Sequence, residues 1–150
     1  MAQHPRLTAL DRVLELTVLL NEDMTTSLAR DGLTTSRAHL LWVLRDTGPT
    51  TQRVLAEALG VSARNVTGLV DALEETGFVT REPHPSDRRA TLVTPTRRGA
   101  EVTAEMADGQ QELSDLLFGG LSATALDDLN RSLDHVLERL KNRLQEVDRA

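Results

Sequence analysis

The most constraining feature of the sequence is a run of small and apolar residues between positions 52 and 70. Two short helices that cross closely need a small residue at the crossing point, a glycine at the turn and apolar residues facing inward. Ala56 meets the first need and Gly60 the second. The inward-facing apolar positions are Leu55, Leu59, Val61, Val66 and Leu69. Because all of these positions are filled, the segment is predicted to be a helix-turn-helix rather than a generic helical hairpin.

Apolar residues at three- and four-residue spacing predict further helices on both sides of this motif. Glycines, prolines and Ser or Thr residues between them supply the breaks and the N-terminal caps. The expected helices cover residues 7–28, 37–45, 52–59, 63–76, 96–118 and 122–147. The first and last of these are long and carry more apolar surface than a small domain can bury by itself.

Two short strands are expected between the fourth and fifth helices, over residues 78–81 and 90–94, joined by a turn-rich segment. A lone two-stranded ribbon is marginal in water, so it must pack against the helices. The predicted fold is therefore mainly α with a small two- or three-stranded β wing, a winged helix-turn-helix. We expect a single domain over 1–150, with a core at 34–99 and dimerisation helices at 6–30 and 100–147.

The charge of the chain is unevenly distributed. The total is −6, but residues 77–98 contain five arginines and two acids, a balance of +3, so the rest carries −9. A basic stretch on an acidic body suits a surface that faces phosphates, because the local potential holds DNA. A solvated arginine-rich loop explains the same numbers equally well.

The second helix of the motif presents small and polar residues on its outer side. Once the inward positions are removed, Ala63, Arg64, Asn65, Thr67 and Gly68 remain at its leading end. Arginine can bind the acceptors of guanine, asparagine the donor–acceptor pair of adenine, and threonine a thymine methyl group or a phosphate. The alternative is that Arg64 and Asn65 are ordinary solvated residues, although no acid occurs on this stretch before Asp71.

The predicted wing supplies a second candidate contact. Arg88 and Arg89 lie at or beside its tip, where a guanidinium group can enter a narrow minor groove. Asp87 is close enough to orient the Arg89 guanidinium through a charge-assisted hydrogen bond. A surface ion pair of little energetic value is the simpler explanation.

The stretch from Thr51 to Gly99 resembles the MarR-type winged helix regulators. It contains the Leu-Glu-x-x-Gly end of a helix, the Asp-x-Arg signature of the wing and the Thr-x-x-Gly start of the next helix. These residues are Leu73, Glu74, Gly77, Asp87, Arg89, Thr96 and Gly99. Pro95 departs from the pattern, because the family usually has leucine there. The order of the surrounding helices agrees, so the likeness covers nearly the whole chain.

The resemblance implies a homodimer that binds a pseudo-palindromic operator in double-stranded DNA and usually represses a neighbouring gene. The predicted DNA contacts are Thr35, Ser36, Arg37, Thr51, Gln52, Ser62, Ala63, Arg64, Asn65, Thr67, Gly68, Asp87, Arg88 and Arg89. The resemblance also implies that a small aromatic or phenolic effector loosens the grip on DNA. Met24, His39 and Trp42 are the candidate pocket residues, and core or interface packing is the alternative role for them.

The long terminal helices are the predicted dimer interface. The last one carries apolar residues at coiled-coil-like spacing, which favours packing on a partner helix. The expected interface residues are Leu7, Leu10, Leu14, Leu129, Leu133, Val136, Leu140 and Leu144. The alternative is that the last helix packs only on its own chain.

Other classes of function find little support. The chain has no cysteine, which excludes disulfides and thiol-based sensing, and its histidines lack the spacing of a metal site. No nucleophile–base pair or phosphate-binding loop is visible, so neither an enzyme nor a bound cofactor is expected. The N-terminus lacks an apolar signal segment and no stretch is long enough to span a membrane, which predicts a cytoplasmic protein. The competing hypothesis is a winged helix used only for protein–protein contact, as an adapter or dimerisation module.

Overall fold

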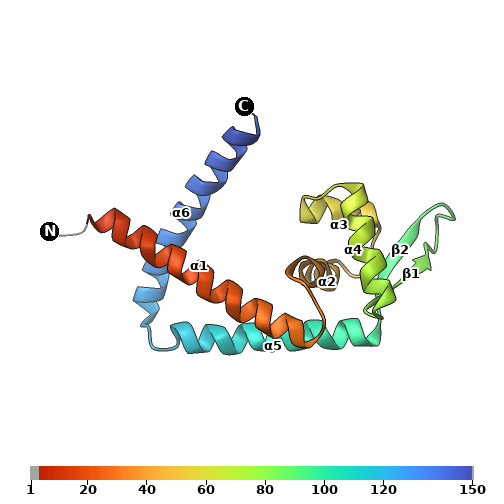
Figure 1. Cartoon of the computed structure of the whole chain (residues 1–150), viewed down its shortest axis with the longest axis horizontal. Coiled ribbons are helices and arrows are strands. Elements are labelled where there is room, and N and C mark those ends of the chain that lie inside the picture. The colour runs from red at the N-terminus through yellow and green to blue at the C-terminus, as the bar shows by residue number, and fades with distance from the viewer. Residues whose placement is uncertain (1–3, 150) are drawn as a thin grey trace. The chain divides into compact units, whose positions relative to one another are not determined.

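A computed structural model describes residues 4–149, which form six helices and one two-stranded antiparallel sheet (Figure 1). Met1 to Gln3, part of the stretch examined for a signal segment, lie outside the described residues. The helices are α1 (Pro5–Arg30), α2 (Thr35–Thr47), α3 (Gln52–Leu59), α4 (Ala63–Glu75), α5 (Arg97–Phe118) and α6 (Ala123–Asp148). The strands are β1 (Val79–Pro83) and β2 (Thr91–Pro95). The predicted fold class, a mainly α winged helix-turn-helix, is confirmed.

The chain divides into two compact units, Met1–Met106 and Ala107–Ala150. The first contains α1 to α4, the sheet and the start of α5. The second contains the end of α5 and all of α6. None of the helices in residues 4–149 is both long enough and apolar enough to cross a membrane.

Side-chain caps set the helix starts that the sequence predicted. The hydroxyl groups of Thr34, Thr51, Ser62 and Ser122 each accept a backbone N–H from the first turn of the following helix. Because Thr34 is the cap, α2 begins two residues earlier than expected. Gly60 ends α3 with φ of 66°, a left-handed conformation that other residues adopt only at a cost.

The helix-turn-helix is held together by its apolar positions. Leu55, Val66 and Val70 are completely or almost completely buried, and Ala56 is 8% exposed where α3 meets α4. Leu59, Val61 and Leu69 pack against this core and are partly buried. Buried leucines of α2 close it from the other side, namely Leu40, Leu41 and Leu44. The packing therefore follows the small-residue and apolar pattern in the sequence.

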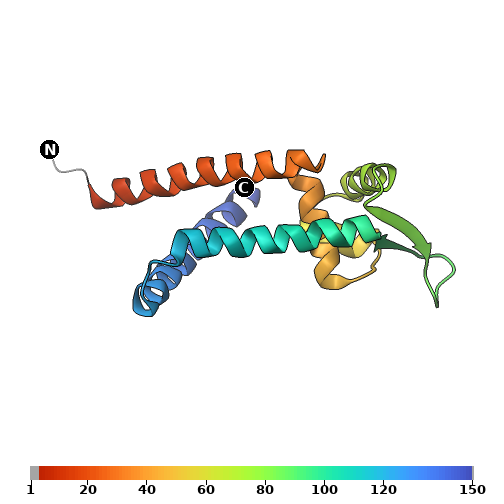
Figure 2. The same cartoon turned by 90° about the horizontal axis from the view of Figure 1, so that it is seen from below.

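The wing is a hairpin in which Val79 pairs with Pro95 and Pro83 with Thr91. An isolated bridge between Thr50 and Val93 adds a partial third strand. The first strand was predicted at residues 78–81, and both limits were wrong. Phe78 is buried just before the strand begins, and the strand continues to Pro83. A proline is tolerated there because it is the last residue of an edge strand, where no ladder N–H is needed. Figures 1 and 2 both show the hairpin projecting past α4, with its loop at the far end.

The junction between the wing and α5 depends on a close backbone approach. The Thr96 hydroxyl donates to the Gly77 carbonyl at 2.6 Å and accepts the Gly99 N–H at 3.1 Å, so it caps α5. A Cβ atom at Gly99 would overlap the carbonyl oxygen of Phe78. The Arg98 guanidinium lies 4.3 Å from the centre of the Phe78 ring and donates to the Thr76 carbonyl at 2.7 Å. Pro95 ends β2 just before this capping threonine, and the capping is intact.

The long helices α1 and α6 leave their apolar residues largely uncovered. Leu28 is the only described residue of α1 that is buried, and α6 has no buried residue among those described. The predicted interface residues follow this pattern, because all are exposed except Leu129, which is partly buried. Figure 2 shows most of α1 extending away from the helix-turn-helix.

Candidate nucleic-acid interface

The leading end of α4 is the surface that the sequence predicted to read DNA. Ser62 caps the helix, and its hydroxyl accepts the Asn65 N–H at 3.1 Å. Five residues in the first two turns are exposed, while Val66 between them is 1% exposed and faces the core. The exposed ones are Ala63, Arg64, Asn65, Thr67 and Gly68. The residues proposed for the major groove are thus all exposed at the same end of the helix.

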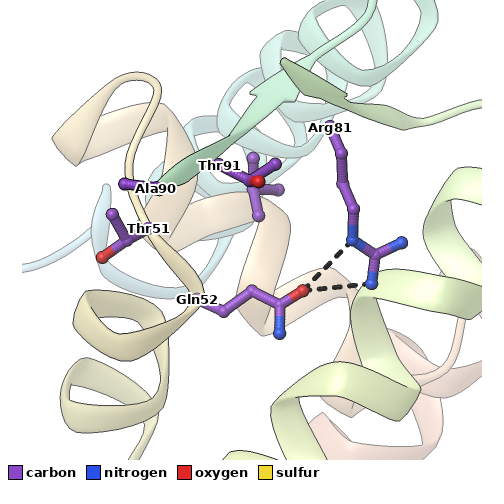
Figure 3. Close-up of a pocket in the computed structure, with 6 residues that line it drawn as sticks. Thr51, Gln52, Arg81, Ala90 and Thr91 are labelled. Carbon is purple, nitrogen blue, oxygen red and sulfur yellow. Dashed lines mark hydrogen bonds between the residues drawn. The ribbon is translucent and has the colours of Figure 1, made fainter. Parts of the chain in front are cut away.

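A chain of hydrogen bonds ties this helix to α3 and to the wing. Gln52, at the start of α3, donates from its Nε2 to the Thr67 hydroxyl at 3.0 Å. Its Oε1 accepts from the Arg81 guanidinium at 3.0 and 3.2 Å, as Figure 3 shows. Gln52 stays a prediction as a DNA contact, and in the free protein its amide binds Thr67 and Arg81. It therefore connects the two helices of the motif with the first strand of the wing.

Arg81 is one of the five arginines counted in the basic stretch, and the structure engages it within the fold. Its guanidinium lies 2.6 Å from Asp71 and 3.0 Å from Glu74, and its backbone N–H also donates to Glu74. The side chain is only 25% exposed, and both acids come from α4. Its charge is therefore neutralised within the fold and adds little to a phosphate-facing surface. The three-residue spacing of the two acids on one helix is a weak hint of this pairing, and the strand that carries the arginine could not be positioned from sequence.

The other four arginines counted in the basic stretch fall into two groups, those with partners inside the protein and those without. Arg97 pairs with Glu101 at 2.9 Å, and Arg98 is engaged at the α5 junction. Within residues 4–149, neither Arg88 nor Arg89 has an acidic partner within 4.0 Å. Both are exposed in the loop of the wing. Arg88 and Arg89 are therefore the arginines of this stretch that are exposed without a described partner.

The wing loop is shaped by two side chains. Asp87 Oδ1 accepts the backbone N–H of Arg89 at 2.9 Å, so the prediction that it orients the Arg89 guanidinium is wrong. A carboxylate two residues before a backbone N–H can close a local turn without reaching the end of the following side chain. The Nδ1 atom of His84 accepts the N–H groups of Ser86 and Asp87, both at 3.1 Å. His84 had no assigned role, and its position at the start of a Pro- and Ser-containing loop is the signal that was missed.

Two further groups of predicted residues lie elsewhere. Thr35 and Ser36 are exposed at the start of α2 and Arg37 is partly buried there, whereas the Thr51 hydroxyl caps α3 by accepting the Val54 N–H. The structure does not join the α2 residues to the α4 surface through any polar contact among the described residues. They stay predictions as DNA contacts.

The three residues proposed for an effector pocket stay a prediction. His39 is exposed, Met24 is 43% exposed, and Trp42 is partly buried beneath the Arg45 guanidinium, 5.2 Å from the ring centre. None of the three lines either of two surface hollows of about 350 and 380 Å³ in the described part of the chain. The first hollow lies between α3 and the wing (Figure 3) and is lined by Thr51, Gln52, Arg81, Ala90, Thr91 and Val93.

We expect Arg81→Ala to lower the free energy of unfolding by about 1–2 kcal/mol, because several charge-assisted hydrogen bonds are lost and two acids are left side by side. Arg53→Ala is the matched control. Arg53 pairs with Glu57 at 3.4 Å, but both side chains are at least 70% exposed, so its loss should cost less than about 0.5 kcal/mol. Urea unfolding followed by circular dichroism measures both. Equal effects of the two substitutions would show that the network around Arg81 adds nothing beyond a surface ion pair.

Together, the buried helix-turn-helix, the exposed leading end of α4 and the arginine-tipped hairpin define a winged helix-turn-helix protein. Residues 33–91 match the family model described as the MarR family. The transcriptional repressor NicR of Pseudomonas putida is 34% identical over 91 residues, which cover 61% of this chain and 58% of NicR. The transcriptional activatory protein BadR of Rhodopseudomonas palustris is 31% identical over 134 residues, which cover 87% of this chain and 75% of BadR.

The solved structures agree with these relatives. The reduced form of MarR from Escherichia coli has a TM-score of 0.69 and 25% identity to this chain, and the match covers 91% of this chain and 98% of that one. The chain therefore belongs to the MarR family of transcriptional regulators. The matched part spans less than two thirds of some relatives, 58% of NicR and 34% of YcgE from Bacillus subtilis.

Proposed function

We propose that the protein is a sequence-specific DNA-binding regulator that inserts the leading end of α4 into the major groove and the wing tip into the adjacent minor groove. The observation that carries this proposal is the exposed surface of Arg64, Asn65 and Thr67, where the first acid is Asp71, one turn further on and paired with Arg81. The uncompensated charges of Arg88 and Arg89 support the second contact, because a narrow minor groove attracts guanidinium groups. The family of the chain supports the same function.

We further propose that the regulator binds a pseudo-palindromic operator as a homodimer. In this proposal the chain works as one MarR-like domain, in which residues 34–99 bind DNA and residues 6–30 and 100–147 form the dimer. The exposed apolar residues of α1 and α6 support it, because continuous apolar stripes in water favour association. Dimer symmetry would place two α4 helices in successive major grooves, about 34 Å apart.

Reduced DNA affinity in the presence of a small aromatic or phenolic effector is the last part of the proposal. It is supported by the family resemblance, and Met24, His39 and Trp42 remain the candidate residues for that effector. Repression is the expected outcome of operator binding; the named relatives include both a repressor and an activator. Titration of aromatic and phenolic acids into the protein–operator complex tests this part, and unchanged affinity across such a panel would remove it.

The DNA-binding proposal is tested by selecting bound fragments from the source genome and then measuring affinity for a selected site at one fixed salt concentration. Arg64→Ala should weaken specific binding by about 1–3 kcal/mol and relax one operator position. Arg89→Ala should weaken binding more evenly across sequences. It should also reduce the slope of log affinity against log salt concentration by about one.

Arg131→Ala is the control for the change in net charge, because Arg131 lies on α6 and pairs with Asp128 at 2.7 Å. Its operator affinity should match that of the wild type. Failure of the wild-type protein to enrich any fragment would reject DNA binding and favour the adapter hypothesis. Unchanged affinity in both the Arg64 and Arg89 variants would reject the groove assignments alone.

A further inference from the structure

Thr67 differs from its neighbours on the exposed face of α4 because its polar group is already in use. Its hydroxyl donates to the Ala63 carbonyl, one turn earlier in the helix, at 2.9 Å. The same oxygen accepts the Gln52 Nε2 donor at 3.0 Å. A hydroxyl group has a single proton to donate, so Thr67 has none left for a base or a phosphate.

The orientation of Gln52 makes this arrangement specific. An arginine guanidinium can only donate, so it requires the oxygen side of the Gln52 amide. The two donors of Arg81 lie 3.0 and 3.2 Å from that oxygen, and Arg81 is itself bound to Asp71 and Glu74. The amide nitrogen is consequently left to face Thr67. The hydroxyl of Thr67 is therefore directed towards the protein by four other side chains.

Thr67 keeps one acceptor lone pair on its oxygen, which cannot bind a phosphate, and it also offers a ligand its γ-methyl group. The residue is exposed, and a Cβ atom added to its neighbour Gly68 would meet nothing within 4 Å. An exposed methyl group flanked by a glycine suits close apolar contact with a flat surface. In the major groove, the apolar feature that distinguishes one base from the others is the C5-methyl group of thymine.

We propose that Thr67 is a specificity-determining residue that selects thymine through methyl–methyl contact, with Gln52 and Arg81 as positioning residues. This inference rests on the proposed operator binding. A threonine at this position could contact either a thymine methyl group or a phosphate. The inference assigns Thr67 to the thymine methyl group. It also explains why Gln52, at the start of α3, is engaged with the protein.

The test uses synthetic operators in which each thymine of both half-sites is replaced in turn by uracil, which removes only the C5-methyl group. The wild-type protein should lose about fourfold in affinity for each half-site at one thymine position, the loss expected for one buried methyl group. Thr67→Ser keeps the hydroxyl and lacks the methyl group, so its ratio of thymine to uracil affinity should fall to about one at that position. Thr67→Val keeps a methyl group and lacks the hydroxyl, so its ratio should stay near fourfold.

Thermal unfolding checks that both variants are folded before their ratios are compared. The inference is overturned if Thr67→Ser retains the wild-type ratio, if Thr67→Val loses it, or if no thymine position responds in the wild type. Absence of any operator binding by the wild type is a different result, since it rejects the proposed function itself.

Discussion

Leu140→Asp is expected to convert the protein from a dimer to a monomer. Leu140 is 52% exposed, and it belongs to the α6 stripe that includes Leu133, Val136 and Leu144. If this stripe is the interface of the proposed homodimer, the substitution buries an unpaired carboxylate in each subunit, at a cost of several kcal/mol. The dissociation constant of the dimer should rise by roughly two orders of magnitude or more. Sedimentation velocity over a range of protein concentrations measures the change.

Asn142→Asp is the matched control for this substitution. It adds the same charge two residues further along α6, on the opposite side of a helix with about 3.6 residues per turn. Asn142 is exposed, and its variant should sediment like the wild type. A wild-type protein that is monomeric at micromolar concentration would contradict the dimer directly, and a dimeric Leu140→Asp variant would remove α6 from the interface.

Gly99→Ala should destabilise the fold strongly. The added Cβ atom would overlap the Phe78 carbonyl oxygen, which belongs to the backbone and cannot rotate away. The wing and the start of α5 must then separate, which also strains the Thr96 cap. We expect a loss of about 1–3 kcal/mol in the free energy of unfolding, at the upper end because rigid backbone is displaced.

Gly109→Ala provides the comparison on the same helix. A Cβ atom at Gly109 meets nothing within 4 Å. In a helix interior, replacing glycine by alanine removes an entropic penalty, so this variant should be more stable by about 0.5–1 kcal/mol. Opposite signs for the two substitutions in urea unfolding would confirm the explanation. If Gly99→Ala were neutral, the close approach at the α5 junction would be wrong.

The local parts of the fold were predictable because their signals are local. Caps, glycine breaks and apolar spacing placed α3 and α4 within a residue of their observed limits, and the same signals predicted which residues of α4 are exposed. The small residue Ala56 and the turn residue Gly60 were assigned from the geometry that two crossing helices require. These inferences needed no knowledge of distant parts of the chain.

The electrostatic part was predicted less well because it depends on the packing of distant segments. Arg81 was counted in the basic stretch, although the packing of β1 beside α4 brings Asp71 and Glu74 to it. Asp87 was correctly placed at the wing, but its partner is the backbone of Arg89 rather than the guanidinium. Sequence spacing limits which atoms can meet, and rotamers and strand register decide which of them do.

The bonds between Arg81, Gln52 and Thr67 also bear on the kinetics of the proposed binding. They join α3, α4 and the wing, so the elements that would read the two grooves are fixed to one another before DNA arrives. Pre-organised contacts lose little conformational entropy when a complex forms. Loosening these bonds should therefore leave the association rate, set by long-range charge, nearly constant and shorten the residence time on the operator.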